Sequence, residues 1–188
     1  SQRGYTEVRG LFSGGGGKWW EEGQTDWKGF PITGYRGWIF QSEDGREKYP
    51  DLGVGLTPDI DSKFADAAIE VIRERSEKPW FVHVNFTAPH DPLFLPPGME
   101  ELYSEAEMEL PGNFLPEHPF DHGNFSGRDE TLMAFPRTEV ATRDVLRVYY
   151  AVISYLDFQV GRILSALEKT GQRENTLIIF ASDHGMAV

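Results

Sequence analysis

The chain has 188 residues, a formal net charge of −12 and no cysteine. The length suffices for one domain with a hydrophobic core, and 39% hydrophobic residues, with 13 Phe and 5 Trp, indicate a folded protein. The negative charge argues against nucleic acid and anionic membrane surfaces as partners. The lack of cysteine excludes disulfides, thiolate metal sites and a cysteine nucleophile on this chain, and no apolar run is long enough to span a membrane.

Glycine and aromatic residues dominate the amino-terminal part of the chain. Residues 5–13 predict a short strand, and four glycines, residues 14–17, directly precede Lys18. A glycine run lets the backbone pass close to another group or adopt positive φ, although a flexible linker has the same composition. Residues 23–49 show no helical periodicity and predict an irregular loop with a short hairpin.

The first predicted helix covers residues 61–76. Asp61 or Ser62 is a suitable cap for its start, and Pro79 stops it. Apolar residues recur at spacings of three and four, which is typical of one buried helix face: Phe64, Ala65, Ala68, Ile69 and Ile72.

A predicted strand and a polar turn follow this helix. Residues 80–86 are rich in aromatic and β-branched types, which predicts a strand buried on both faces. The turn at residues 87–92, with the sequence TAPHDP, carries His90 and Asp91. Turns favour polar residues, so on this local sequence alone an ordinary surface role for both residues is the simpler interpretation.

Residues 93–137 are the least regular part of the chain and predict a long excursion over the surface. Residues 99–108 predict a short acidic helix. His118, Asp121 and His122 are of the types that bind metals, but Pro119 interrupts any continuous helical face. A solvated loop is therefore favoured over a metal site here.

The second predicted helix, residues 140–169, is the clearest element of the sequence. Gly171 is a good terminator for it. A second strand, residues 176–181, follows and ends in the polar loop SDHG at residues 182–185. The helix carries one apolar stripe: Val145, Tyr149, Val152, Leu156, Val160, Ile163 and Leu167.

The alternation of strands and helices predicts an α/β fold with a mostly parallel sheet flanked by helices. In such a sheet the loops after the strands meet at one edge, which here carries Lys18, His90 and Asp91, and Asp183 with His184. A cation, imidazoles and carboxylates suit an anionic substrate and a hard metal ion. An α/β domain whose edge residues are only structural remains an alternative.

Four segments of the chain resemble a known family. Gly17–Trp19, the TAPHDP turn, the helix with its YYAVISYLDFQVGRILSALEKTG sequence and the SDHG loop together resemble the type I sulfatases of the alkaline phosphatase superfamily. No single motif is specific, but their combined order and spacing are. The resemblance extends over most of the chain, from about residue 4 onward.

This resemblance implies hydrolysis of sulfate esters of a glycan, or of aryl or alkyl sulfates, by a formylglycine nucleophile and a Ca²⁺ ion. Carried over by position, Lys18 and His90 match the residues that bind the sulfate oxygens and assist the leaving group. Asp183 and His184 match two of the metal ligands. The family also implies a periplasmic, secreted or lysosome-like location.

The chain departs from the family pattern in several places. Trp20 stands where the family has a His, and no Cys or Ser stands in the C/S-x-P-x-R motif that yields formylglycine. We therefore expect residues 1–188 to be a partial catalytic domain, lacking the amino-terminal nucleophile strand and the segments beyond the SDHG loop. Alone, it should be inactive and should bind Ca²⁺ weakly. Alternatives are a phosphodiesterase or phosphonate monoester hydrolase of the same superfamily, or a non-catalytic module that binds anionic glycans.

Overall fold

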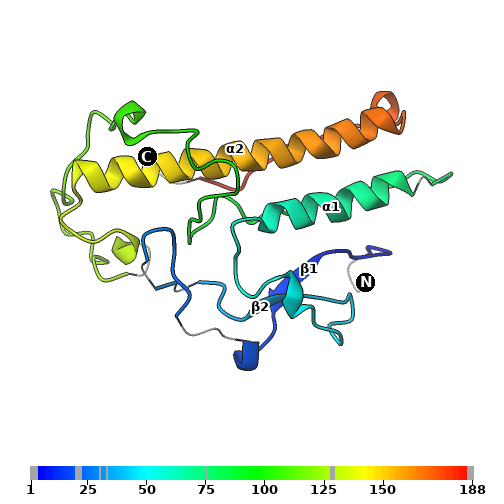
Figure 1. The fold of residues 1–188 in the computed structure, drawn as a ribbon, viewed down its shortest axis with the longest axis horizontal. Coiled ribbons are helices and arrows are strands. Elements are labelled where there is room, and N and C mark those ends of the chain that lie inside the picture. Colours follow the sequence, from blue (N-terminus) through cyan, green and yellow to red (C-terminus); the bar gives the residue numbers. More distant parts are fainter. Residues whose placement is uncertain are drawn as a thin grey trace.

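The computed structural model describes residues 4–19, 23–29, 31–32, 34–74, 76–127 and 130–185. Two α-helices, α1 (Ile60–Arg73) and α2 (Glu139–Lys169), lie side by side and run in the same direction in the upper half of Figure 1. Below them lies an antiparallel sheet of two strands, β1 (Leu11–Gly14) and β2 (Trp38–Gln41). Single 3₁₀ turns interrupt the connecting segments: Gly17–Trp19, Pro50–Leu52, Glu105–Glu107, Glu130–Leu132 and Arg173–Asn175.

Both predicted helices are confirmed. The hydroxyl of Thr138 accepts a hydrogen bond from the backbone N–H of Ala141 at 3.2 Å and so caps α2, while Gly171, with φ of +69°, turns the chain away at its end. α1 ends at Arg73, earlier than the predicted residue 76. Among the described residues, neither helix has the uninterrupted apolar length that a membrane span requires.

Helix α1 connects the sheet to α2 through two apolar clusters. Its first half packs on the sheet, where Phe12 and Phe40 are paired across the strands with ring centroids 5.1 Å apart. Its second half packs on the end of α2 through four buried residues: Ile69, Ile72, Ala166 and Leu167. The sheet, α1 and α2 therefore form consecutive layers.

The strand predicted at residues 5–13 is present only at its end, as β1. The strands predicted at residues 80–86 and 176–181 are extended segments that pair with no other strand among the described residues. Residues 81–86 alternate between exposed and half-buried positions, and residues 177–181 are exposed throughout. Phe81 is 73% exposed and Leu177 is 86% exposed. The predicted burial on both faces is therefore wrong for this chain, because it requires flanking strands and helices that the described residues do not supply. The mostly parallel sheet is not confirmed; the sheet that is present is antiparallel.

The excursion between the helices contains no α-helix among its described residues. The predicted acidic helix at residues 99–108 is wrong; only the 3₁₀ turn Glu105–Glu107 forms there. Ser104 and Glu107 make a capping box at this turn. Pro111 lies shortly beyond it, and a proline cannot supply the N–H that a continuing helix needs.

Candidate active site

His90 lies in a tight turn after the first extended segment. Its backbone N–H donates to the carbonyl of Thr87 at 3.0 Å. The ring nitrogen Nδ1 is 2.6 Å from the carbonyl oxygen of Asp91 and 3.3 Å from Oδ1 of the same residue. Because a carbonyl oxygen only accepts hydrogen bonds, Nδ1 carries a proton, which leaves Nε2 as the ring nitrogen available to a ligand.

An aromatic neighbour fixes one side of the His90 ring. The ring of Tyr35 stands at 90° to it with centroids 5.0 Å apart, and Tyr35 in turn packs edge-on against Trp38 of β2. The His90 side chain remains 46% exposed. The ring is thus oriented by contacts yet accessible to a solute.

Asp61 of α1 is hydrogen-bonded to the turn that carries His90. It lies in the first turn of α1, is only 5% exposed, and its Oδ1 accepts a hydrogen bond from the backbone N–H of Thr87 at 3.3 Å. Burial raises the pKa of this carboxyl to about 6, against the opposing effect of hydrogen bonds from Ala88 and Thr87. The sequence suggested a helix cap at Asp61; in the structure the residue instead ties α1 to the loop that carries His90.

The chain beyond His90 is anchored on α2. Leu93 is 5% exposed and packs against Val148, Tyr149 and Val152. The hollow beside His90 is lined by side chains from α1, the turn and α2, among them Asp61, Thr87, Leu93, Val152 and Tyr155. Two helices therefore fix the position of this loop.

The SDHG loop reaches the same part of α2. A side chain at Gly185 would lie 3.5 Å from the Tyr149 hydroxyl, so the loop passes directly over that turn of the helix. The backbone N–H of His184 donates to Oδ1 of Asp183 at 2.9 Å. This hydrogen bond, with the charges of His184 and His90, holds the pKa of Asp183 below its usual value. Asp183 and His184 are nevertheless 89% and 83% exposed.

The structure brings the His90 turn and the SDHG loop to the same part of α2, but it does not bring Lys18 to them. Both loops contact the same residue of α2, because Leu93 packs on Tyr149 and a Cβ at Gly185 would lie 3.5 Å from the Tyr149 hydroxyl. Lys18 is exposed, with its Nζ 4.9 Å from the centroid of the Trp19 ring. The described residues give it no contact with His90 or Asp183.

Sterics require glycine at one position of the run that precedes Lys18. A Cβ on Gly15 would lie 2.6 Å from Cγ2 of Ile39 and 2.7 Å from Cδ1 of Trp19. The N–H of Gly15 donates to the carbonyl of Gly37 at 2.8 Å, so the run is bonded to the segment that leads from Tyr35 into β2. The run is therefore fixed at Gly15 and is not a free linker there.

A scan against protein-family models matches the sulfatase family over residues 1–188. The chain belongs to the sulfatase family. Among curated proteins it is 27% identical over 191 residues to a sulfatase of Formosa agariphila, covering 94% of this chain and 36% of that protein. It is also 35% identical over 114 residues to the choline-sulfatase of Rhizobium meliloti, covering 60% of this chain and 22% of that protein.

A third relative is named for the alkaline phosphatase superfamily. The multifunctional alkaline phosphatase superfamily protein PehA of Trinickia caryophylli is 26% identical over 187 residues, 82% of this chain and 36% of that protein. This sulfatase chain thus spans about a third or less of the length of these curated relatives. A search of solved structures found no significant match.

The family implies a divalent metal, and Asp183 and His184 fit only part of a calcium shell. Ca²⁺ takes six to eight oxygen ligands, whereas these two residues offer one carboxylate and one imidazole. The described residues bring no third His, Asp or Glu into a metal-binding group with them. Trp20, which stands at the family's His position, lies outside the described residues.

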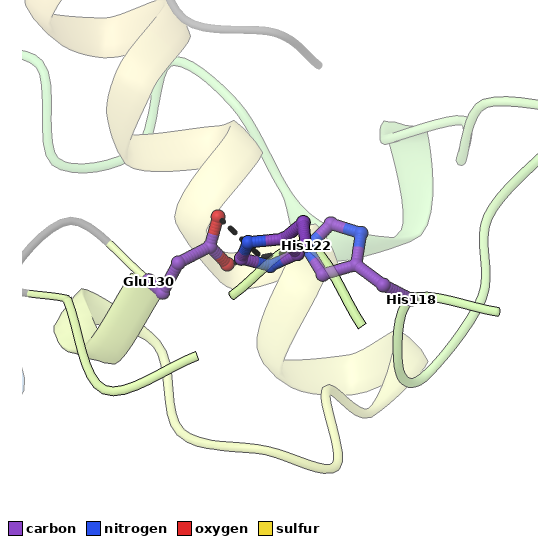
Figure 2. Close-up of side chains that lie close together, drawn as sticks. All are labelled: His118, His122 and Glu130. Carbon is purple, nitrogen blue, oxygen red and sulfur yellow. Dashed lines mark hydrogen bonds and ion pairs between the residues drawn. The ribbon is translucent and has the colours of Figure 1, made fainter. Parts of the chain in front are cut away.

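A separate His/Glu cluster lies in the excursion (Figure 2). Nε2 of His118 is 3.2 Å from Oε2 of Glu130, and Nε2 of His122 is 3.8 Å from Oε1 of the same residue. The sequence singled out the two histidines but paired them with Asp121. That carboxylate instead accepts from the N–H of Gly123 at 2.7 Å. No motif pointed to Glu130, which folding brings to the histidines.

Proposed function

We propose that this chain forms part of the catalytic domain of an enzyme that hydrolyses sulfate esters. The observation that carries the proposal is that the His90 turn and the SDHG loop meet over one turn of α2, in a chain that matches the sulfatase family throughout. The substrate class is a sulfated small molecule or glycan. Among the relatives, the choline-sulfatase bears such a substrate in its name.

His90 has the geometry of a group that assists the leaving oxygen. Its Nδ1–H is bound to the carbonyl of Asp91, so only Nε2 is available to a substrate. A protonated ring donates Nε2–H to the ester oxygen, which takes up that proton as the S–O bond breaks. Lys18 would supply a point charge for the sulfate oxygens; this role rests on the family resemblance, since the described residues give Lys18 no contact with His90 or Asp183.

Asp183 and His184 would supply two ligands to a Ca²⁺ ion, whose charge stabilises negative charge on the sulfate group. The low pKa of Asp183 keeps its carboxylate ionised and able to bind a cation at neutral pH. The nucleophile, a formylglycine in this proposal, comes from outside residues 1–188 because this sequence has no C/S-x-P-x-R motif.

The arrangement of the strands in the whole protein is part of the same proposal. Residues 80–86 and 176–181 each return from the end of a helix, and the two helices run in the same direction. Both segments are extended and rich in apolar side chains. We infer that they are neighbouring strands of a mostly parallel sheet flanked by helices in the whole protein, with partners supplied by the rest of its chain.

Hydrolysis of a chromogenic aryl sulfate by the whole protein tests the function. His90→Ala should lower kcat by about 100-fold or more, the usual contribution of a general acid, while Asp121→Asn should leave it within about twofold. Asp121 serves as the control because it is exposed, lies outside the proposed site and accepts a hydrogen bond from the backbone N–H of Gly123. Equal activity of both variants would overturn the role of His90. Residues 1–188 alone should show no turnover.

A phosphoester hydrolase is the second candidate, because the relative PehA is named for several activities of the superfamily. Phosphate monoesters, diesters and phosphonates should be assayed beside the aryl sulfate. A kcat/KM higher for any of them than for the sulfate would favour this candidate. Binding of sulfated glycans without turnover of any ester would instead indicate a non-catalytic module.

A further inference from the structure

The His/Glu cluster of the excursion has the form of a metal site. His118, His122 and Glu130 each offer one ligand atom, and these atoms all lie within 4.8 Å of one another. In Figure 2 the two imidazole rings lie beside the carboxylate of Glu130, which projects from the start of a 3₁₀ turn. Among the described residues this is the one group of three or more such side chains.

The spacing matches a tetrahedral ion. Ligand atoms at about 2.0–2.1 Å from Zn²⁺ lie about 3.4 Å from each other in a tetrahedron. Nε2 of His118 lies 3.2 Å from Oε2 of Glu130 and Nε2 of His122 lies 3.8 Å from Oε1, so the separations fall on either side of that value although the two imidazoles approach different carboxylate oxygens. The imidazole planes stand at 89° to each other with centroids 4.7 Å apart. Small side-chain shifts suffice to admit the ion.

Neighbouring side chains hold the ligands in place. Nη2 of Arg137 is 2.8 Å from Oε2 of Glu130 and fixes the carboxylate through that oxygen, which leaves Oε1 directed at His122. Phe125 packs against both imidazoles, with centroids 5.7 Å from His118 and 4.6 Å from His122. Such outer contacts orient metal ligands and strengthen binding.

The donor set selects the ion. Two imidazoles and one carboxylate are ligands that Zn²⁺ favours, and with three protein ligands a fourth position remains for water or substrate. Ca²⁺ requires several more oxygen ligands than Glu130 provides. The chain has no cysteine, so no thiolate competes for zinc.

We propose that Nε2 of His118, Nε2 of His122 and a carboxylate oxygen of Glu130 bind a Zn²⁺ ion that joins the two ends of this loop. The site is distinct from the calcium site assigned to Asp183 and His184 and does not depend on the proposed sulfatase activity. At this site the ion replaces the His118–Glu130 hydrogen bond and the His122–Glu130 ion pair as the cross-link between residues 118–122 and Glu130.

Titration of the chelator-treated chain with zinc against a chromophoric chelator tests the site. The chain should bind one zinc ion with micromolar or tighter affinity. His118→Ala, His122→Ala and Glu130→Gln should each weaken binding by at least about tenfold. Asp121→Asn is the matched control, since this carboxylate lies in the same loop but caps Gly123, and it should change nothing. His83→Ala controls for zinc binding by an exposed histidine.

Cobalt(II) gives a second readout that needs no variant. The wild-type chain should show the intense visible d–d bands of tetrahedral cobalt, and added zinc should abolish them while Ca²⁺ should not. Glu130→Gln keeps the side-chain shape, so its far-UV circular dichroism should match that of the wild type. Unchanged zinc affinity in a His118→Ala/His122→Ala chain, no zinc uptake, or an octahedral cobalt spectrum would each overturn the proposal.

Discussion

The chain contains two units of the same design whose loops are held very differently. In each, a helix ends, an extended segment returns along it, and a polar loop follows: α1 leads to His90 and α2 leads to Asp183. The His90 loop is bonded to Asp61 and anchored by buried Leu93. Asp183 and His184 are almost fully exposed and bond chiefly within their own loop.

This difference shows which part of the site is built by residues 1–188. The His90 imidazole is positioned by two helices and an aromatic ring, whereas the SDHG loop passes over α2 with little to hold its side chains. Substitutions in the two units should therefore have unequal effects.

The largest expected effect is at the anchor of the first loop. Leu93→Ala removes a buried side chain from the cluster with Val148, Tyr149 and Val152, and should lower the free energy of unfolding by about 2–5 kcal/mol. Urea denaturation followed by circular dichroism measures the change. A loss below about 1 kcal/mol would show that the first loop is held no better than the second.

The tie from α1 to the first loop should be visible in the pH dependence of stability. The pKa of Asp61 is about 6 in the folded chain and close to 3.8 when unfolded, so its contribution to stability is complete below about pH 4 and is lost as the pH rises through 6. Relative to Asp61→Asn, the wild type should lose about 3 kcal/mol between these limits.

Asp59→Asn provides a control of opposite sign. Burial opposes ionisation of Asp59, but hydrogen bonds from Lys63 and Thr57 outweigh it and lower the pKa. The wild type should therefore gain stability over Asp59→Asn as the pH rises from the acid range. Parallel pH profiles for Asp61→Asn and the wild type would contradict the buried tie to Thr87.

A smaller effect is expected at the end of the helix of the second unit. Gly171 has φ of +69°, and a Cβ added there would meet no atom within 4 Å, so Gly171→Ala should cost about 1 kcal/mol through backbone conformation alone. Gly161, inside α2, also has open space around it; Gly161→Ala should instead stabilise the chain by up to about 1 kcal/mol. Thermal melting of both variants checks the opposite signs.

The smallest effect is expected in the second extended segment. Leu177 is 86% exposed, so Leu177→Ala should change the unfolding free energy of residues 1–188 by less than about 0.5 kcal/mol. In the whole protein, where we propose a buried strand, the same substitution should cost about 2–5 kcal/mol. Equal small losses in both would contradict the parallel sheet.

The sequence predicted the parts that depend on local pattern. Apolar spacing located both helices. The order of elements predicted that the His90 turn and the SDHG loop share one edge of a parallel sheet; both loops contact Tyr149 of α2, but their common role in a site stays a prediction. The catalytic role of Lys18 stays a prediction. Burial of residues 80–86 was wrong because burial is a property of neighbours, which a strand's own composition does not contain.

Sequence reasoning missed the roles of Asp61 and Glu130, because their partners lie far away in sequence or outside any motif. Asp61 carries the pattern of a helix start, and nothing local shows that Thr87 is its partner. Glu130 lies twelve residues from His118 without a recognisable ligand spacing. A proline beside the histidines argued against a helical site, but side chains on a loop converge without sharing a helical face.

The length of helix α2 fixes the relative orientation of its contacts with the two loops and with α1. Tyr149, under the two loops, and Leu167, against α1, lie eighteen residues apart, which is about five turns of helix and about 27 Å along one face. Loss of a single residue between them would rotate one contact by about 100° relative to the other. The length of this helix therefore tolerates change only in steps that return both contacts to the same side.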